Sequence, residues 1–305
     1  MQNKIAILAA LLIAQLALYS GLTASGGDFG ARAAGEPLLG FDPAAVQRLA
    51  LGDGDGRAVE VARDGDGWTL PDHYDFPAGK ANVQRLLKTL EGLAPALPVA
   101  TSSDAAERFR VGEEGYERRI DLFDGDGNRL ARLYVGDAPG ARRAYVRAAD
   151  DAAVYEAEID RAALGTEPSD WTDPMALRRK PADLKRIEAG DVTLVRDEEG
   201  EWRLQGLEDG QSTDPKAAKG LVGKLAFLQY DRVLGKKKEG AKPKEATTVV
   251  TFTPKEGEPV EYRLTADGQD RYTLTASDLP WRFRLTKGQA GPLTGIDRAK
   301  LRKES

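Results

Sequence analysis

An internal repeat constrains the fold of this chain more than any other feature of its sequence. Residues 42–49 (DPAAVQRL) resemble residues 180–187 (KPADLKRI), and each copy precedes two short alternating segments joined by a turn rich in acidic residues and glycine. Alternation bounded by such turns is typical of a β-hairpin. The two hairpins span residues 58–70 and 192–204, with Trp68 and Trp202 at matching places in their second strands. The chain is therefore expected to fold as two related halves.

A helix is predicted after each hairpin, because apolar residues recur there at helical spacing. These residues are Val83, Leu86, Leu87, Leu90 and Leu93 in the first half, and Leu221, Val222, Leu225 and Leu228 in the second. The two sets align without a gap. Asp214 and Pro215 suit the N-cap and the first turn of the second helix.

Further strands are expected to close each half. They lie within residues 119–123, 130–135, 144–147 and 154–155 in the first half, and within residues 248–252, 260–264, 271–274 and 281–285 in the second. Each half then has the order β-β-α-β-β-β-β. The short links between strands favour mainly antiparallel sheets with one helix packed on a face, which is an α+β fold.

The N-terminus carries an apolar run without charge, from Ile5 to Leu22. As a helix rising ~1.5 Å per residue, this run reaches roughly 27 Å, about the thickness of a bilayer core. It predicts an uncleaved transmembrane anchor, and a cleaved signal peptide is the alternative. Lys4 before the run favours an N-in orientation in the inner (cytoplasmic) membrane. The bulk of the chain would then be periplasmic or otherwise extracytoplasmic.

The predicted division of the chain has an anchor, a linker, two repeats, a joint and a tail. These parts are the transmembrane anchor (1–24), a flexible linker (25–38), the first α+β repeat (39–165), the joint (166–180), the second α+β repeat (181–296) and a polar tail (297–305). A duplicated fold often places a groove at its joint. Trp171 in the joint, with Trp68, Trp202 and Trp281, is therefore a candidate groove residue, and a place in the core is the alternative for each of them.

The composition excludes several kinds of site. The chain has no cysteine and a single histidine, His73, so thiolate metal sites and two-histidine metal sites within one chain are impossible. The net charge is −5 and no basic face is evident, which argues against nucleic-acid binding. The sequence contains no nucleophile elbow, phosphate-binding loop or dinucleotide fingerprint. It therefore predicts no catalytic residue and no cofactor.

The runs of Asp and Gly are expected to form turns and not calcium sites. Residues 124–128 (DGDGN) supply the first three ligand positions of an EF-hand loop. Arg129 stands where that loop needs glycine, and Val135 where it needs glutamate. Asp and Gly are also the residues that tight turns require. The sequence accordingly predicts no metal ligand.

Taken together, these features resemble a bacterial family of unknown function. Its members have an N-terminal membrane segment and a tandem extracytoplasmic domain, and they are often encoded beside gliding-motility-type ABC transporter components. The residues that carry the resemblance belong to strands and turns, and they are Trp68-Thr69-Leu70, Pro77-Ala78, residues 83–93, Tyr134-Val135-Gly136-Asp137, residues 144–147, Val154-Tyr155, Trp171 and Asp173-Pro174. The resemblance implies a role beside an ABC transporter, and it transfers no active-site residue.

Three functional hypotheses follow. The leading one is a non-enzymatic accessory protein, held to the membrane by residues 5–22, whose outer body binds an ABC transporter permease, a related membrane protein or the transporter's cargo. The second is an envelope hydrolase that uses a pair of carboxylates. The third is a structural envelope protein that binds others through its sheet edges.

Overall fold

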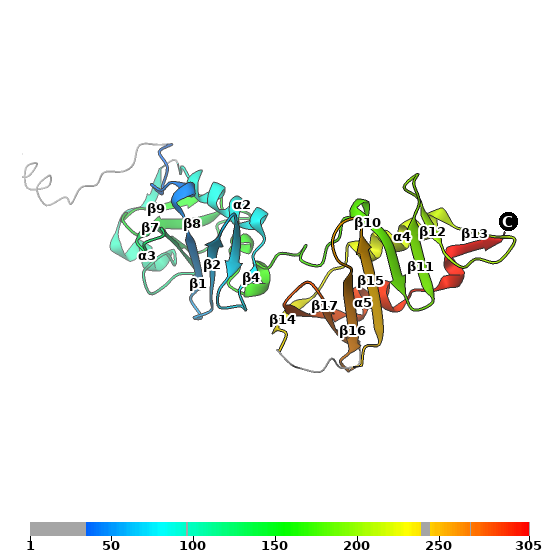
Figure 1. The fold of residues 1–305 in the computed structure, drawn as a ribbon. Coiled ribbons are helices and arrows are strands. Elements are labelled where there is room, and N and C mark those ends of the chain that lie inside the picture. The colour runs from blue at the N-terminus through cyan, green and yellow to red at the C-terminus, as the bar shows by residue number, and fades with distance from the viewer. Residues whose placement is uncertain (1–34, 96, 239–244, 269, 305) are drawn as a thin grey trace, which may run out of the picture.

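The computed structural model describes residues 35–95, 97–238, 245–268 and 270–304 of the chain. The described part is an α+β protein with two large antiparallel sheets and few helices, which form two lobes (Figure 1). Within it, no helix is both long and apolar enough to cross a bilayer. The predicted anchor, residues 5–22, lies outside the described residues.

The first sheet has nine strands, and all neighbouring pairs are antiparallel. In spatial order they are β4 (Phe76–Pro77), β3 (Gly67–Leu70), β2 (Ala58–Asp64), β1 (Arg48–Asp53), β6 (Arg118–Phe123), β7 (Arg129–Val135), β8 (Ala144–Ala148), β9 (Val154–Ala157) and β5 (Pro98–Ala100).

The second sheet has eight strands and is also antiparallel throughout. In spatial order they are β12 (Trp202–Leu204), β11 (Val192–Arg196), β10 (Leu184–Ala189), β15 (Thr248–Pro254), β16 (Val260–Ala266), β17 (Arg271–Ala276), β18 (Trp281–Thr286) and β14 (Arg232–Lys236). From β3 to β5 the first sheet has the same strand order as the second sheet from β12 to β14.

Each half contains strands that the predicted order β-β-α-β-β-β-β lacks. One is the first strand of the half, β1 in the first and β10 in the second, which lies inside its sheet. Another is the strand after the main helix, β5 in the first half and β14 in the second, which lies at a sheet edge. β1 escaped prediction because Leu51, Gly52 and Asp53 are buried in succession, so the strand does not alternate. β5 has only three residues, and β14 has a register shift between Val233 and Gly235.

One helix covers a face of each sheet, as the apolar spacing predicted. α2 (Lys80–Glu91) buries Val83, Leu86, Leu87 and Leu90, and α4 (Pro215–Ala226) buries Ala218, Val222, Leu225 and Ala226. The N-cap prediction for α4 is confirmed, because the Asp214 carboxylate accepts hydrogen bonds from the backbone N–H groups of Lys216 and Ala217 at 2.9 and 3.0 Å. Each half also has a second, shorter helix, α3 (Ser103–Arg108) in the first and α5 (Lys287–Thr294) in the second.

Both halves have a core of their own between the sheet and its helix. Leu49, Val61 and Leu90 are fully buried in the first core, and Leu194, Phe252 and Leu285 are fully buried in the second. Full burial of one such side chain contributes roughly 1.5–3 kcal/mol relative to exposure. A smaller cluster on the opposite face of the first sheet includes Tyr134 and Val154.

The predicted joint and the predicted polar tail end their halves in the same way. Trp171 O accepts a hydrogen bond from Gly79 N, which precedes α2, and Leu301 O accepts one from Asp214 N, which precedes α4. After Trp171, Thr172 bridges to Ala78. After Leu301, β19 (Arg302–Glu304) pairs with β13 (Gln211–Thr213). Both segments are therefore packed parts of a half, and Leu301 is buried rather than part of an exposed tail.

The two halves contact each other through a side chain of the first sheet. Phe76 on β4 is fully buried, yet it packs in the core of the second half. Its ring centroid lies 4.9 Å from that of Trp281 and 5.9 Å from that of Phe283. The Trp281 indole N–H also donates to Tyr74 O at 2.9 Å. Figure 1 shows β4 at the edge of the first lobe that faces the second.

The segment between the halves is held by the hydroxyls of two tyrosines of the second half, the partly buried Tyr230 and the buried Tyr262. Tyr230 donates to Asp173 O at 2.6 Å, and Tyr262 donates to Leu177 O at 2.9 Å. Burial raises the pKa of both phenols to about 12. They therefore remain hydrogen-bond donors throughout the physiological range.

Candidate functional site

A cleft of about 1060 Å³ lies in the first half. We call it the α2 cleft, because one wall is the exposed side of α2, with Arg85 and Thr89. The opposite wall runs from the end of β9 through residues 158–165. Its floor is apolar and includes Leu86, Leu93 and Trp171, which are 2–5% exposed. This is the size range of many ligand pockets.

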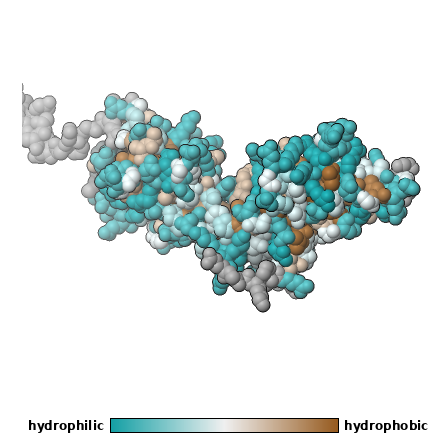
Figure 2. All heavy atoms as spheres, viewed as in Figure 1, coloured by the Kyte–Doolittle hydropathy of each residue, from teal (hydrophilic) through white to brown (hydrophobic). Residues whose placement is uncertain are grey.

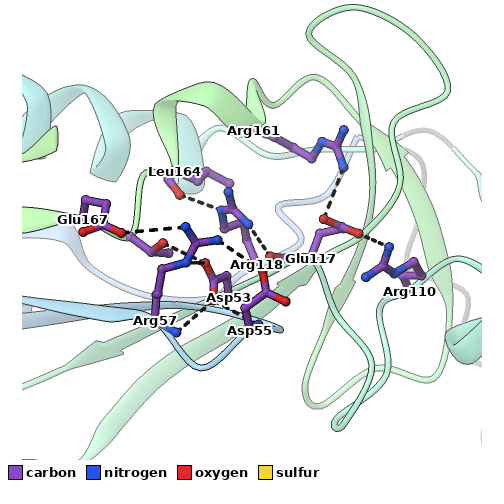
Figure 3. Close-up of polar contacts among 10 residues, drawn as sticks. Asp53, Asp55, Arg57, Arg110, Glu117, Arg118, Arg161, Leu164 and Glu167 are labelled. Carbon is purple, nitrogen blue, oxygen red and sulfur yellow. Dashed lines mark hydrogen bonds and ion pairs between the residues drawn. The ribbon is translucent and has the colours of Figure 1, made fainter.

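A polar network fixes the wall opposite α2 (Figure 3). Its centre is Asp53, whose carboxylate accepts hydrogen bonds from Arg57 N at 2.9 Å and from the Thr166 hydroxyl at 3.0 Å. Arg57 Nε lies 2.9 Å from the second carboxylate oxygen. Burial raises the pKa of the Asp53 carboxyl, but these hydrogen bonds and the Arg57 charge outweigh it, so the pKa lies below its usual value.

Two arginines extend this network along the wall (Figure 3). Arg118 Nε donates to Leu164 O at 3.0 Å. Arg161 pairs with Glu117 at 3.8 Å, and Glu117 also pairs with Arg110. Asp53 at the end of β1, Glu117 just before β6 and Arg118 at its start thus bond to residues 161–166 and hold this wall on the side away from α2.

The corresponding surface of the second half is closed by α5. This helix follows β18 as residues 158–165 follow β9, and it packs against α4 as well as against β15, β17 and β18. In the first half the same stretch forms only a short 3-10 turn, η2 (Arg161–Ala163). The two halves therefore differ at one surface, which is covered in the second half and open in the first.

The α2 wall of the cleft is positively charged, with Arg85 and Lys88, and the opposite wall is mixed. The opposite wall carries the acidic residues Glu156, Glu158 and Asp160 together with two arginines, Arg142 and Arg143. Glu156 pairs with Arg143 at 3.1 Å, and Asp160 accepts a hydrogen bond from Ala162 N as the cap of η2. Arg85 and Lys88 have no carboxylate partner among the described residues.

The four candidate tryptophans do not form one site. Trp171 lines the α2 cleft, and its indole N–H donates to Gly165 O at 2.8 Å. Trp68 and Trp202 lie in the cores of the first and second halves. Trp281 lies at the contact between the halves, against Phe76. The α2 cleft itself was missed, because it depends on the separation of segments far apart in the chain.

Apart from Asp53, the acidic residues with clearly shifted pKa values serve turns and caps. The pKa of Asp124 lies below its usual value, chiefly because the Asn128 side-chain amide donates to it, and the Asn128 and Asp126 N–H groups donate as well. This is the tight turn predicted for residues 124–128. Asp197 and Asp214 also have lowered pKa values, chiefly because Arg203 donates to the first and the Ala217 N–H to the second.

A second groove, of about 660 Å³, lies over the face of β16, β17 and β18 that α4 does not cover. The strand register places Arg263, Thr275 and Arg282 in one row across it. Arg263 pairs with Glu261 at 2.6 Å and Arg282 donates to Leu234 O at 3.3 Å, while the Nε atom of each arginine is buried without a hydrogen-bond partner. Figure 2 shows a mainly hydrophilic face with small hydrophobic patches on the second half.

The chain was also compared with known proteins. A family model described as a domain of unknown function (DUF4340) matches residues 68–249, from β3 of the first sheet to β15 of the second. No curated protein and no solved structure shows significant similarity to the chain. Because the match covers more than half of the 305 residues, the chain belongs to the DUF4340 family of domains of unknown function.

Proposed function

We propose that this protein is a membrane-tethered, extracytoplasmic accessory protein that binds a partner membrane protein and catalyses no reaction of its own. The observation that carries the proposal is the α2 cleft, with its apolar floor, charged walls and fixed outer wall. Concave sites with a few placed polar groups are typical of binding surfaces.

The position of the cleft relative to the predicted anchor supports this function. Leu38 N donates to Leu93 O at 2.6 Å, and Leu93 belongs to the floor of the cleft. The chain therefore enters the folded body beside the cleft. If residues 5–22 lie in a bilayer, residues 23–37 allow at most ~50 Å between the membrane and this point. A cleft at that distance can meet the outer surface of a neighbouring membrane protein.

Three of the four carboxylates that line the cleft are engaged in holding its wall, and the exposed Glu158 alone cannot supply both groups that hydrolysis needs. Hydrolysis of a glycoside requires one acid and one base or nucleophile, both facing the substrate. Glu156 is paired with Arg143, Asp160 caps η2, and Asp170 accepts a hydrogen bond from Glu167 N at 3.1 Å. These carboxylates hold the wall together.

The partner that we propose is an ABC transporter permease or a related membrane protein. This choice comes from the family resemblance in the sequence, which concerns genes encoded side by side. The localisation that goes with it is a single-pass protein of the inner membrane, with its bulk on the periplasmic side.

Crosslinking in native membranes tests this function. A tagged full-length protein is crosslinked with an amine-reactive reagent, purified and analysed by mass spectrometry. Recovery of a permease or its ATPase, lost when residues 5–22 are deleted, is the expected result. Recovery of only envelope polymers, or of only the protein itself, would instead favour the hydrolase or the structural envelope protein.

A further inference from the structure

We infer that the α2 cleft receives a short helix of the partner protein, with an apolar stripe on one side and carboxylates toward α2. This inference rests on the proposed function and names the element that the accessory protein recognises. It comes from a comparison between the two halves of the molecule.

The surface beside α2 in the first half is equivalent to the surface beside α4 in the second half. β9 ends at Ala157 and β18 at Thr286, and Trp171 and Leu301 then occupy matching places beside α2 and α4. Between these points the second half folds residues 287–294 into α5, which buries Ala290 and Leu293 in its core. A capping box between Thr286 and Gln289 starts this helix.

The first half leaves a gap beside α2 where the second half has α5. Ile159 and Leu164 bury apolar side chains in the core, with 2% and 0% exposure, as Ala290 and Leu293 do in the second half. The Leu164 carbonyl, however, accepts a hydrogen bond from Arg118, and the nearby Thr166 hydroxyl donates to Asp53, which holds this segment on the outer side. Residues 158–165 therefore leave a gap beside α2, whereas α5 packs directly against α4. A helix as long as α5 is ~12 Å long and ~10 Å wide, or roughly 900 Å³ in volume. The cleft, at about 1060 Å³, has room for it.

The charges of the cleft walls determine which charges the partner helix should carry. The α2 wall presents Arg85 and Lys88, both exposed and without a carboxylate partner in the described part of the chain. The opposite wall is mixed in charge, because the exposed Glu158 lies there with the exposed Arg142 and Arg143. A helix in the cleft is therefore favoured when its Asp or Glu residues face α2. The apolar stripe meets Leu86, Leu93 and Trp171 on the floor.

Because the chain has no cysteine, a single introduced thiol tests the inference directly. Full-length Thr89→Cys protein is labelled in native membranes with a thiol-reactive photocrosslinker, and the crosslinked peptides are sequenced by mass spectrometry. Lys224→Cys is the matched control, since this exposed residue occupies the position on α4 that Thr89 occupies on α2. We expect an adduct from Thr89→Cys, and none from Lys224→Cys, with one extracytoplasmic permease segment that has apolar residues at helical spacing and flanking carboxylates.

Charge reversal completes the test. Arg85→Glu with Lys88→Glu should lower the yield of this adduct about tenfold, since two favourable contacts become repulsive. Lys219→Glu with Lys224→Glu, on the exposed side of α4, should leave it unchanged. If the amine-reactive reagent recovers the permease but Thr89→Cys gives no adduct, or one with a basic or non-helical segment, the inference is wrong and the accessory function stands. If no reagent recovers a membrane partner, the proposed function itself fails.

Discussion

Replacing Phe76 with alanine should weaken the second half of the protein, although Phe76 lies on a strand of the first sheet. The ring is fully buried, and its aromatic neighbours Tyr230, Trp281 and Phe283 all belong to the second half. Loss of a buried phenylalanine ring costs about 3–5 kcal/mol. With a urea m-value of about 2 kcal/mol/M, the midpoint for unfolding of the second half should fall by roughly 1.5–2.5 M.

Tryptophan fluorescence during urea unfolding of the full-length protein in detergent measures this effect. Variants that keep only Trp68 or only Trp202, with phenylalanine in place of the other tryptophans so that an aromatic ring remains at position 281 beside Phe76, report the first or the second half, since each of these two residues lies in one core. Phe76→Ala should move the Trp202 transition and leave the Trp68 transition nearly in place. Leu90→Ala, in the core of the first half, is the matched control and should do the reverse. If Phe76→Ala shifts the Trp68 transition instead, or neither, Phe76 does not couple the halves as described.

Three other predictions concern buried groups. Asp53→Asn should cost about 1–3 kcal/mol by leaving donors at the cleft wall unpaired. The pKa of Asp53 is lower in the folded protein than in the unfolded chain. Its contribution to folding stability is therefore present above the usual carboxyl pKa and is lost as the pH falls through the folded pKa. In Asp53→Asn, the free energy of unfolding should accordingly fall less steeply at acid pH than in the unmodified protein. The pKa of Tyr262 is raised to about 12, so the folded protein should lose roughly 2–3 kcal/mol of stability as the pH rises from about 10 to about 12. Tyr262→Phe should remove this loss when the free energy of unfolding is measured over the same pH range. If the variant loses as much stability as the unmodified protein, the prediction is wrong. Leu301→Ala should lower the Trp202 midpoint at a cost of about 2–5 kcal/mol, whereas a mutation in an exposed tail would have no effect.

Periodic segments of the fold could be predicted from the sequence. α2 and α4 follow from apolar residues every three or four positions, and Asp214 marks the start of α4. α5 could not be found in this way, because Gly288, Gly291 and Pro292 disfavour a helix. The capping box and the burial of two of its side chains outweigh that preference.

The candidate site was less accessible to prediction than the fold. Trp171 is predicted for a groove at the joint between the halves, whereas the α2 cleft that it lines lies within the first half. That cleft depends on the bonds of Arg118 to Leu164 and of Thr166 to Asp53, which hold its outer wall. These contacts join residues 46 and 113 positions apart in the chain. No local pattern encodes such separations. The position of Phe76 in the core of the second half is hidden from the sequence for the same reason.

The matched endings of the two halves have a consequence for how such a chain can grow. Each half returns its last residues to the start of its own helix, through the bonds from Gly79 to Trp171 and from Asp214 to Leu301. In the described part of the chain the two large sheets thus share no strand, and Phe76 is the side chain by which the first half enters the core of the second. Adding another module after Glu304 would require only a spacer like residues 173–180 and an aromatic anchor equivalent to Phe76. The architecture permits concatenation, and arrays of three or more modules are structurally possible from the same parts.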